Sequence, residues 1–263
     1  ARTALPAPDD VSRLLADEPT ATLLREARTL GCYHLESPPL RHLLRRLGDA
    51  DFDALAAAVA LVRPGARRAG LVERFLRAAQ HHRAWQGTTD LPIFEEDLHR
   101  EARRRAGLGR AAVEQLQHTL RRARGGPAPP SLRALFFEAC RARGTPDVAA
   151  ERLWTQVETF SGASSGRAHC ATAVRLGLGA AWWRAHAPAA FFAALLAHGG
   201  GYYPSEVYLQ EARRVGLQLL PPSVNRSDAR HTPDTDGTAV RLGLRQVRGL
   251  PRAAATAILR ARR

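Results

Sequence analysis

A short loop rich in glycine and serine carries the residues best suited to hold a phosphate group. The sequence SGASSGRAH at residues 161–169 leads directly into a helical stretch. Such a loop exposes backbone N–H groups and presents a helix N-terminus, and both attract anions. Arg167 and His169 add charged donors. The alternative is a surface loop with an incidental arginine, and the loop alone does not decide between the two.

Two further basic segments fit the same chemistry. The first is HLES at residues 34–37 followed by LLRRL, which contains Arg45 and Arg46, and the second is ALVRPG at residues 60–65, which contains Arg63. The guanidinium group offers a planar pair of donors that matches a phosphate. Three such segments in one chain favour a polyphosphate or nucleic-acid ligand over coincidence.

Other catalytic and metal-binding patterns are missing from the sequence. It contains no G-x-S-x-G, no H-E-x-x-H, no P-loop and no G-x-G-x-x-G after a strand. We expect His81 and His82 to form a solvated pair. The acidic run at residues 95–97 stands beside basic residues, which favours ion pairs along a helix over a cation site. Three cysteines without a C-x-x-C spacing predict buried thiols.

The charge of the chain is a second guide. The 263 residues include 39 basic and 25 acidic side chains, a net charge of +14, and every lysine-or-arginine position is arginine. This surplus suggests a polyanionic partner such as nucleic acid. A sequence without lysine and rich in alanine is also typical of a GC-rich genome, so solvated helix faces explain the surplus equally well.

No segment predicts insertion into a membrane or export. The apolar runs of the second half of the chain are interrupted by Arg175 and Arg184, and the N-terminus lacks the apolar core of a signal peptide. We therefore expect a cytoplasmic protein with no membrane partner. The sequence starts at Ala1 and not at a methionine, which leads us to expect a processed or excised piece of a longer chain.

Helices position these residues over most of the chain. In residues 51–63, Phe52, Leu55 and Val59 recur on one face, and Asp49 or Asp51 can cap the start. Thr145 and Pro146 are a typical beginning of a helix that carries Leu153, Val157 and Phe160 on one stripe. Further helices are expected at residues 39–47, 68–84, 92–106, 109–124, 131–143, 168–186, 188–198 and 204–215.

The composition changes after residue 216. LQLLPP and AVRLGL each predict a short strand, the two strands can pair, and HTPDTDGT between them has turn composition. The sequence therefore predicts a mainly α-helical protein with a small β element near residues 217–244. Its parts are a flexible start at residues 1–8, a multi-helix domain at 9–216, and a β connector with the start of a C-terminal helical segment at 217–263.

The order of these segments resembles the fingers region of the C-family bacterial replicative DNA polymerase, the DNA polymerase III alpha subunit, including its error-prone branch. GCYHLESPPLRHLLRRL is similar to "GVFQLES…LL-R-x-L", and DFDALAAAVALVRPG to "F-D-D-I-x-A-x-x-A-L-x-R-P-G". IFEEDLHREA takes the place of "YQEQ", and FSGASSGRAHCATAV that of "FxGYGFNKSHAxAYA". WWRAHAPAAFFAALL and GYYPSEVYLQEARRVGLQLLPPSVNRSDA resemble the connection that follows. The resemblance spans residues 9–250.

This resemblance implies a helical fingers domain that closes over the incoming dNTP and the templating base. Phe94 stands at the tyrosine of "YQEQ", and Arg167 and His169 stand at the lysine and histidine of "NKSH". There they would hold the triphosphate and neutralise the charge that builds up on the leaving pyrophosphate. The residues implied to lie along the nucleotide or DNA path are Arg45, Arg46, Arg63, Phe94, Arg167 and His169.

The sequence departs from the family in the same loop. Gly166 and Ala168 replace the Asn and Ser of "NKSH", and Ala163 and Ser165 replace the aromatic residues of "GYGF". Arginine in place of lysine at position 167 keeps the charge but changes the geometry. These departures predict weaker nucleotide binding.

The resemblance also implies Mg²⁺, which the family binds through palm aspartates in a "P-D-x-D-x-D" pattern that this chain lacks. We therefore expect no metal in this segment and no catalysis by it alone. The implied partners are the DNA primer-template, the dNTP, the palm and thumb, and, as a further candidate, a sliding clamp. The alternative is a degenerate, non-catalytic, arginine-rich DNA-binding or scaffolding protein, and a third is an unrelated helical interaction module.

The C-terminal sequence LRQVRGLPRAAATAILRARR looks like the entry to a helix-hairpin-helix motif, which grips DNA phosphates through backbone N–H groups. Gly249 is present, but Pro251 replaces the second glycine of that motif and removes one N–H group. We therefore favour a plain C-terminal helix, with the helix-hairpin-helix as the alternative.

Overall fold

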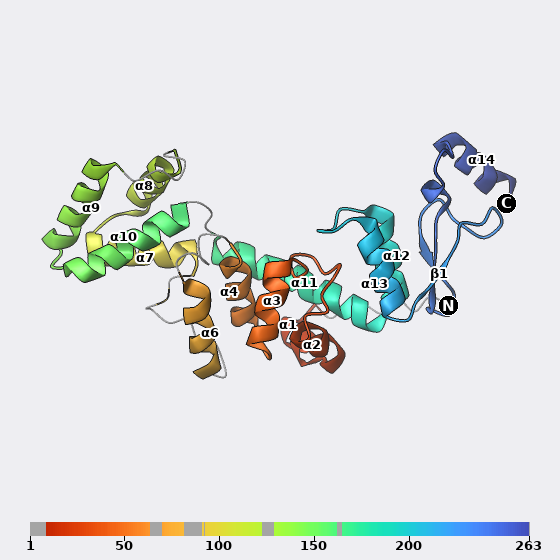
Figure 1. The fold of residues 1–263 in the computed structure, drawn as a ribbon, viewed down its shortest axis with the longest axis horizontal. Coiled ribbons are helices and arrows are strands. Elements are labelled where there is room, and N and C mark those ends of the chain that lie inside the picture. Colours follow the sequence, from red (N-terminus) through yellow and green to blue (C-terminus); the bar gives the residue numbers. More distant parts are fainter. Residues whose placement is uncertain are drawn as a thin grey trace. The chain divides into compact units, whose positions relative to one another are not determined.

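The computed structural model describes residues 9–63, 70–81, 91, 93–122, 129–161 and 165–262 (Figure 1). Most of these residues are helical, and three short strands lie near the C-terminus, which confirms the predicted mainly α class with a small β element. The contacts group the chain into two compact units. Unit 1 comprises residues 1–49 and 175–263, and unit 2 comprises residues 50–174. The domain boundaries suggested by the sequence stay predictions.

Unit 2 packs its helices around aromatic side chains. Trp154 is 2% exposed, and its ring centroid lies 5.1 Å from that of Phe136. Leu153 and Val157 are also buried, as the predicted stripe requires, whereas Phe160 lies outside the described side chains. The elements of unit 2 are α4 (Phe52–Leu61), α6 (Leu71–His81), α7 (Glu95–Ala106), α8 (Arg110–Arg122), α9 (Pro130–Ala142), α10 (Asp147–Ser161) and the first turns of α11 (Arg167–His186).

The burial of α4 goes beyond the single apolar face that the sequence predicts. Asp51 caps the helix by accepting the Ala54 N–H at 2.7 Å. Every residue from Ala54 to Leu61 is then buried. A helix that is apolar on all sides can be buried completely. The many small alanine side chains of α4 let neighbouring residues approach it closely from every side.

The ends of α7 are fixed by one carboxylate and one glycine. The Asp97 carboxylate accepts the N–H groups of Ile93 and Phe94 at 3.1 and 3.0 Å, which holds Phe94 extended just before the helix. For this reason α7 begins three residues later than predicted. Gly107 ends it in the left-handed conformation, with φ +69°. The hydroxyl of Thr145, predicted to cap α10, donates to the Arg105 carbonyl at 2.6 Å and so anchors the start of α10 to α7.

Unit 1 combines the N-terminal helices with the second half of the chain. Asp10 and Asp17 cap its first two helices through side-chain hydrogen bonds. Both α3 and α12 begin with proline and end before a glycine, close to the predicted bounds. The helices of unit 1 are α1 (Val11–Ala16), α2 (Glu18–Arg25), α3 (Pro38–Leu47), the remainder of α11, α12 (Pro188–His198), α13 (Ser205–Arg214) and α14 (Arg252–Ala261).

A three-stranded sheet follows α13. Its strands, in spatial order, are β1 (Gln218–Leu220), β3 (Ala239–Arg241) and β2 (Thr232–Pro233). β1 is parallel and β2 antiparallel to β3. The two predicted strands are confirmed, whereas β2 lies in the segment assigned to turns. Val240 of the central strand belongs to one buried cluster with Phe192 of α12, so the sheet packs on that helix.

Candidate nucleotide and nucleic-acid site

Helix ends of unit 2 bring two predicted site residues together. Arg167 is the first residue of α11, and Phe94 directly precedes α7. The guanidinium carbon of Arg167 lies 4.5 Å from the centre of the Phe94 ring, within the range of a cation–π contact. The fold of unit 2 therefore places a cation and a flat apolar face side by side.

Carboxylates already surround Arg167. Its backbone N–H lies 3.1 Å from both oxygens of Glu96, so an acid caps the N-terminus of α11. Its side chain pairs with Asp53 of α4 at 3.5 Å. These two side chains are 46% and 55% exposed, so solvent screens the pair. A phosphate that binds Arg167 has to compete with both carboxylates.

Arg63 and His169 belong to the same unit. Arg63 is half-buried just after α4, and His169 is exposed in the first turn of α11. Burial raises the pKa of the Cys170 thiol, and the hydrogen bond with the Ser165 side chain and the positive charge of Arg63 oppose that rise. Residues 162–164 of the predicted phosphate loop lie outside the described residues.

Arg45 and Arg46 lie in unit 1. Both are exposed in the last turn of α3, where cations also complement the helix dipole. Because they belong to the other unit, their gathering with Arg63 and Arg167 around one nucleotide stays a prediction.

The HLES segment contains a structural residue that sequence analysis missed. Glu36 is 6% exposed and accepts hydrogen bonds from the Gly31 N–H, the Tyr202 N–H and the Tyr208 hydroxyl, each at 2.8 Å. Burial, together with the Glu36 carboxylate, raises the pKa of Tyr208 to about 12. Glu36 thus joins the first helices of unit 1 to the segment before α13.

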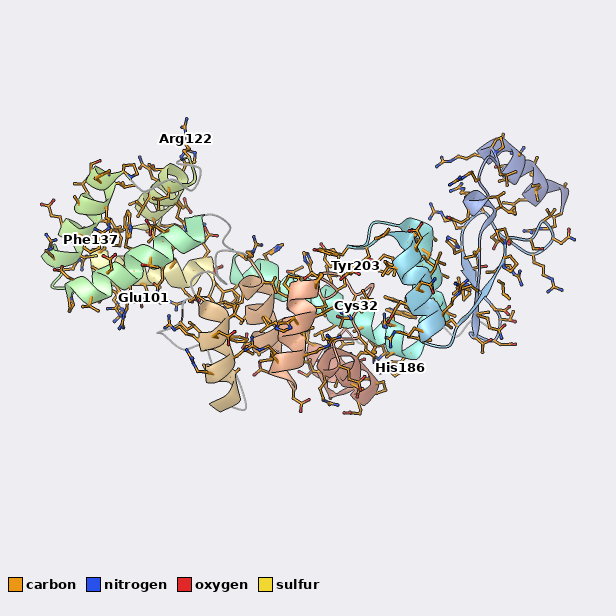
Figure 2. All side chains as sticks on the ribbon, in the orientation of Figure 1. Cys32, Glu101, Arg122, Phe137, His186 and Tyr203 are labelled. Atoms are coloured by element: carbon orange, nitrogen blue, oxygen red, sulfur yellow. The ribbon has the colours of Figure 1, made fainter. Side chains whose placement is uncertain are left out.

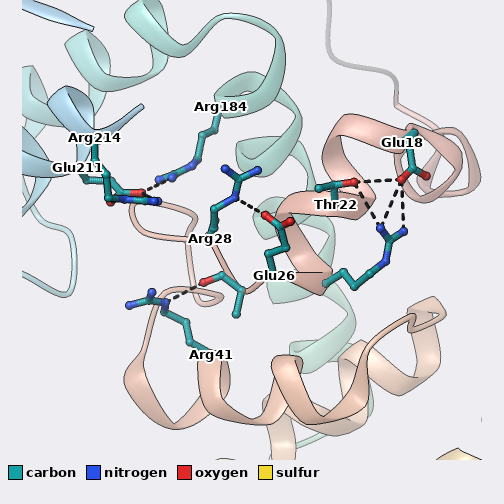
Figure 3. A network of polar contacts seen from close by, with 10 residues as sticks. Glu18, Thr22, Glu26, Arg28, Arg41, Arg184, Glu211 and Arg214 are labelled. Carbon is teal, nitrogen blue, oxygen red and sulfur yellow. Dashed lines mark hydrogen bonds and ion pairs between the residues drawn. The ribbon is translucent and has the colours of Figure 1, made fainter. Parts of the chain in front are cut away.

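A buried ion pair was also missed. Arg184 in the last turn of α11 is 3% exposed and pairs with Glu211 of α13 (Figure 3). It also donates to the Leu30 carbonyl. Arg214 donates to Glu211 as well, at 2.7 Å. Burial pushes the pKa of Glu211 upward, but the hydrogen bonds from Arg214 and Arg184 outweigh it and hold that pKa below its usual value. Arg184 therefore belongs to the interior of unit 1.

The acidic run at the start of α7 forms local contacts. Glu95 lies 3.7 Å from His99, and Asp97 lies 3.2 Å from Arg100, in agreement with the predicted helical pairs. Within the part of the chain that the structure describes, no group of three or more His, Cys, Asp or Glu side chains is placed to hold a metal ion.

All three cysteines are free and buried, which confirms the prediction of buried thiols. Burial raises the pKa of Cys32 (Figure 2) to about 12. His81 and His82 lie outside the described side chains. Across the described helices, none combines the length and the apolar character needed to cross a bilayer.

Comparison with known families identifies the first half of the chain. Residues 9–144, more than half of the chain, match the model of the bacterial DNA polymerase III alpha subunit finger domain. The chain belongs to this family. The matched region includes Arg45, Arg46, Arg63 and Phe94, whereas Arg167 and His169 lie beyond it. A helix-hairpin-helix motif matches residues 216–263.

Error-prone DNA polymerases are among the curated relatives of this chain. Those of Mycobacterium bovis, Dechloromonas aromatica and Symbiobacterium thermophilum are 33%, 32% and 30% identical to it over 255, 256 and 280 residues. The alignments cover 92%, 92% and 94% of this chain but 23%, 25% and 26% of those polymerases. The chain thus spans about a quarter of the length of these relatives.

The helix-hairpin-helix match favours the alternative that we had placed second for the C-terminus. A 3₁₀ turn at Leu244–Gln246 and Gly249, with φ +80°, lead into α14. The side chain of Arg262, just after α14, donates to the carbonyls of Val224 and Ser227 at 3.0 and 2.8 Å. These bonds tie α14 back to the connector, as a compact motif requires.

Proposed function

We propose that this chain is the fingers portion of a bacterial DNA polymerase III alpha-like DNA polymerase of the error-prone type. In this role it positions the template and the incoming dNTP for template-directed DNA synthesis. The finger-domain match and the error-prone polymerases among its relatives support the proposal. The observation that carries it is the contact between Arg167 and Phe94 at the start of α11.

In the proposed mechanism the start of α11 binds the triphosphate. Phe94 holds the Arg167 guanidinium in place, and Arg167 exchanges Asp53 for phosphate oxygens. His169 in the first turn of α11 and Arg63 after α4 supply further hydrogen-bond donors for the triphosphate. Donors fixed in this way stabilise the negative charge that develops on the leaving pyrophosphate. Arg45 and Arg46 of unit 1 contact the template or nucleotide.

The acidic residues beside this site do not fit the Mg²⁺ ions that the family uses. Asp97 caps α7, Glu96 caps α11 and Glu95 faces His99, so these carboxylates are engaged within the protein. We therefore place the metal ions in a palm domain outside this chain and expect this segment alone to be inactive. Palm and thumb, and a sliding clamp, are the protein partners this role implies.

Nucleotide binding by the 263-residue chain tests the proposal. A fluorescent dATP analogue is titrated into wild type, Arg167→Ala, Arg167→Lys and the matched control Arg175→Ala, which removes an exposed arginine farther along α11. Arg167→Ala is expected to raise the Kd about tenfold, because a charge-assisted hydrogen bond is lost. Arg167→Lys should recover part of the affinity, and Arg175→Ala should stay within about twofold of wild type. In a complete polymerase, Arg167→Ala should raise the KM for nucleotide.

An unchanged Kd in Arg167→Ala would show that the start of α11 does not bind the nucleotide. Circular dichroism of each variant checks that a lost affinity does not come from a lost fold.

A non-catalytic DNA-binding protein derived from such a polymerase is the second candidate. The Glu96 carboxylate at the N-terminus of α11 favours it, because it stands where a phosphate would bind. The helix-hairpin-helix match supports DNA binding without nucleotide binding. If wild type binds single-stranded DNA but no dNTP at millimolar concentration, this second function replaces the first.

A further inference from the structure

A basic cleft of about 610 Å³ lies in unit 2 at the C-terminal end of α7. It is bordered by α7, the start of α8 and the residue after α9, and its lining consists of four arginines, one histidine and two glycines. Its volume is within the range of ligand pockets, about 300–1,000 Å³. The cleft begins at His99, in the middle of α7, whereas Phe94 precedes that helix, and neither Phe94 nor Arg167 lines the cleft.

Three helices deliver the cations of the cleft. Arg100 and Arg103 lie one turn apart on α7, Arg110 opens α8, and Arg143 follows α9. Gly107 allows Arg143 to approach the backbone, because a Cβ at that position would lie 2.7 Å from the Arg143 Nε. The side chain of Arg143 thus lies over the turn between α7 and α8.

The positive charge of the cleft is only partly neutralised. Arg100 pairs with Asp97 at 3.2 Å, and Arg110 pairs with Glu114 at 2.7 Å. Over the described residues, Arg103 and Arg143 form no ion pair, and no carboxylate lines the cleft. Two guanidinium groups therefore face the cleft without a counter-ion among the described residues of unit 2.

The N-terminus of α8 adds to the positive electrostatic potential of the cleft. The Gly109 carbonyl accepts the Val113 N–H at 3.1 Å, which makes Gly109 the residue before the helix. The first N–H groups of the 13-residue helix α8 lack intrahelical partners and carry the positive end of its dipole. The four arginines together offer more bidentate donors than a single phosphate can accept.

We propose that this cleft binds consecutive backbone phosphates of a single DNA strand. The arginines supply charge-assisted hydrogen bonds, and the open rim leaves the bases free. The proposal does not depend on the nucleotide site at Phe94 and Arg167, since its variants change residues that line only the cleft.

A pair of substitutions at Gly109 tests the cleft. A Cβ there meets nothing within 4 Å, and both Asp and Asn are good caps for α8, so Gly109→Asp and Gly109→Asn should fold equally well. The two differ by one negative charge. We expect the Kd of the full 263-residue chain for a fluorescent oligothymidylate of about 20 nucleotides to be about fivefold higher in Gly109→Asp than in Gly109→Asn. Equal values in two folded variants, checked by thermal unfolding, would overturn the proposal.

The salt dependence of binding supplies a second measurement. Arg103→Gln and Arg143→Gln are compared with Arg152→Gln, which removes an exposed arginine of α10 from the same unit. Each cleft variant should lower the slope of log Kd against log salt by about 0.7, the value for one phosphate contact on a single strand. Arg152→Gln should leave the slope unchanged. An equal change in all three variants would show that only net charge matters and would overturn the site.

Competition with sodium tripolyphosphate at constant ionic strength identifies the source of the phosphate. One outcome is that tripolyphosphate displaces the oligonucleotide at equal phosphate concentration and that Gly109→Asp weakens tripolyphosphate binding as much as DNA binding. The cleft is then a site for free polyphosphate, and the proposal of a DNA strand is wrong. If tripolyphosphate does not displace the oligonucleotide, the strand is the ligand.

Discussion

Arg167 and Arg184 lie at the two ends of α11, and each meets a carboxylate and a phenylalanine ring. Arg167 pairs with Asp53 and lies 4.5 Å from the Phe94 ring, and Arg184 pairs with Glu211 and lies 5.3 Å from the Phe192 ring. The side chain of the first arginine is 46% exposed and that of the second is 2% exposed. The same two contacts thus occur once in solvent and once in the interior.

The difference in burial decides what each arginine can do. An exposed pair contributes at most about 1 kcal/mol, so Arg167 can exchange its carboxylate for a phosphate at little cost. Breaking a buried pair leaves an uncompensated charge and costs about 3–5 kcal/mol. Arg184 therefore holds unit 1 together, and Arg167 is available to a ligand.

Removing Arg184 gives the largest expected effect. Arg184→Ala should lower the free energy of unfolding of the chain by about 3–5 kcal/mol, because Glu211 stays buried with only Arg214 beside it. The double variant Arg184→Met/Glu211→Leu should lie closer to wild type than the single variant. Urea denaturation followed by circular dichroism measures both. If Arg184→Ala lowers the free energy of unfolding by less than about 1 kcal/mol, the buried arginine contributes no more to stability than the exposed Arg167.

Two glycines of α11 test how tightly the helix packs beside Arg184. A Cβ at Gly177 would lie 2.5 Å from Leu35 Cγ and 2.8 Å from the Tyr33 carbonyl oxygen, whereas one at Gly179 meets nothing within 4 Å. Gly177→Ala is therefore expected to destabilise the chain by about 1–3 kcal/mol. Gly179→Ala, the matched control, should stabilise it by up to about 1 kcal/mol, since alanine is the better helix former. Equal urea midpoints for the two variants would contradict the observed packing.

The buried pair also predicts a dependence on pH. The pKa of Glu211 lies below its usual value of 4.5, so the charged form is favoured in the folded state. Its contribution is complete above pH 4.5 and is lost as the pH falls through the lowered pKa. The urea midpoint of wild type should therefore fall more steeply between pH 5 and pH 3 than that of Arg184→Met/Glu211→Leu. Parallel curves would show that Glu211 does not contribute.

Removing the exposed arginine gives the smallest effect on stability. Arg167→Ala should change the free energy of unfolding by less than about 1 kcal/mol, while it weakens nucleotide binding as described above. The same urea experiment provides the value. A loss above about 2 kcal/mol would assign Arg167 a structural role like that of Arg184.

The sequence predicts the helices well where local chemistry sets their ends. Proline at the start and glycine after the end mark α3 and α12, and α12 has the predicted bounds of residues 188–198. The start of α7 was misplaced because the Asp97 side chain holds Phe94 extended, which depends on side-chain geometry. β2 was missed because a two-residue strand with proline has no alternating pattern.

The candidate site was only partly accessible from the sequence. The basic loop and the family resemblance pointed to Arg167 and Phe94, and unit 2 places them together. The carboxylate of Glu96 at the same helix end was not foreseen, because Glu96 and Arg167 are 71 positions apart and no local rule connects them. The sequence did not predict that Glu36 and Arg184 are buried, because their partners are also distant in the chain. Long-range partners of charged residues are set by the fold and not by neighbours in the chain.

The complete enclosure of α4 has a consequence for engineering. Five of the eight buried residues between Ala54 and Leu61 are alanine, the smallest side chain with a Cβ atom. Because every residue of this stretch is buried, we expect none of its positions to tolerate a bulky label. In a library that randomises this helix, clones that fold should carry small apolar residues at consecutive positions. They should not show the helical periodicity of apolar and polar residues that amphipathic helices have.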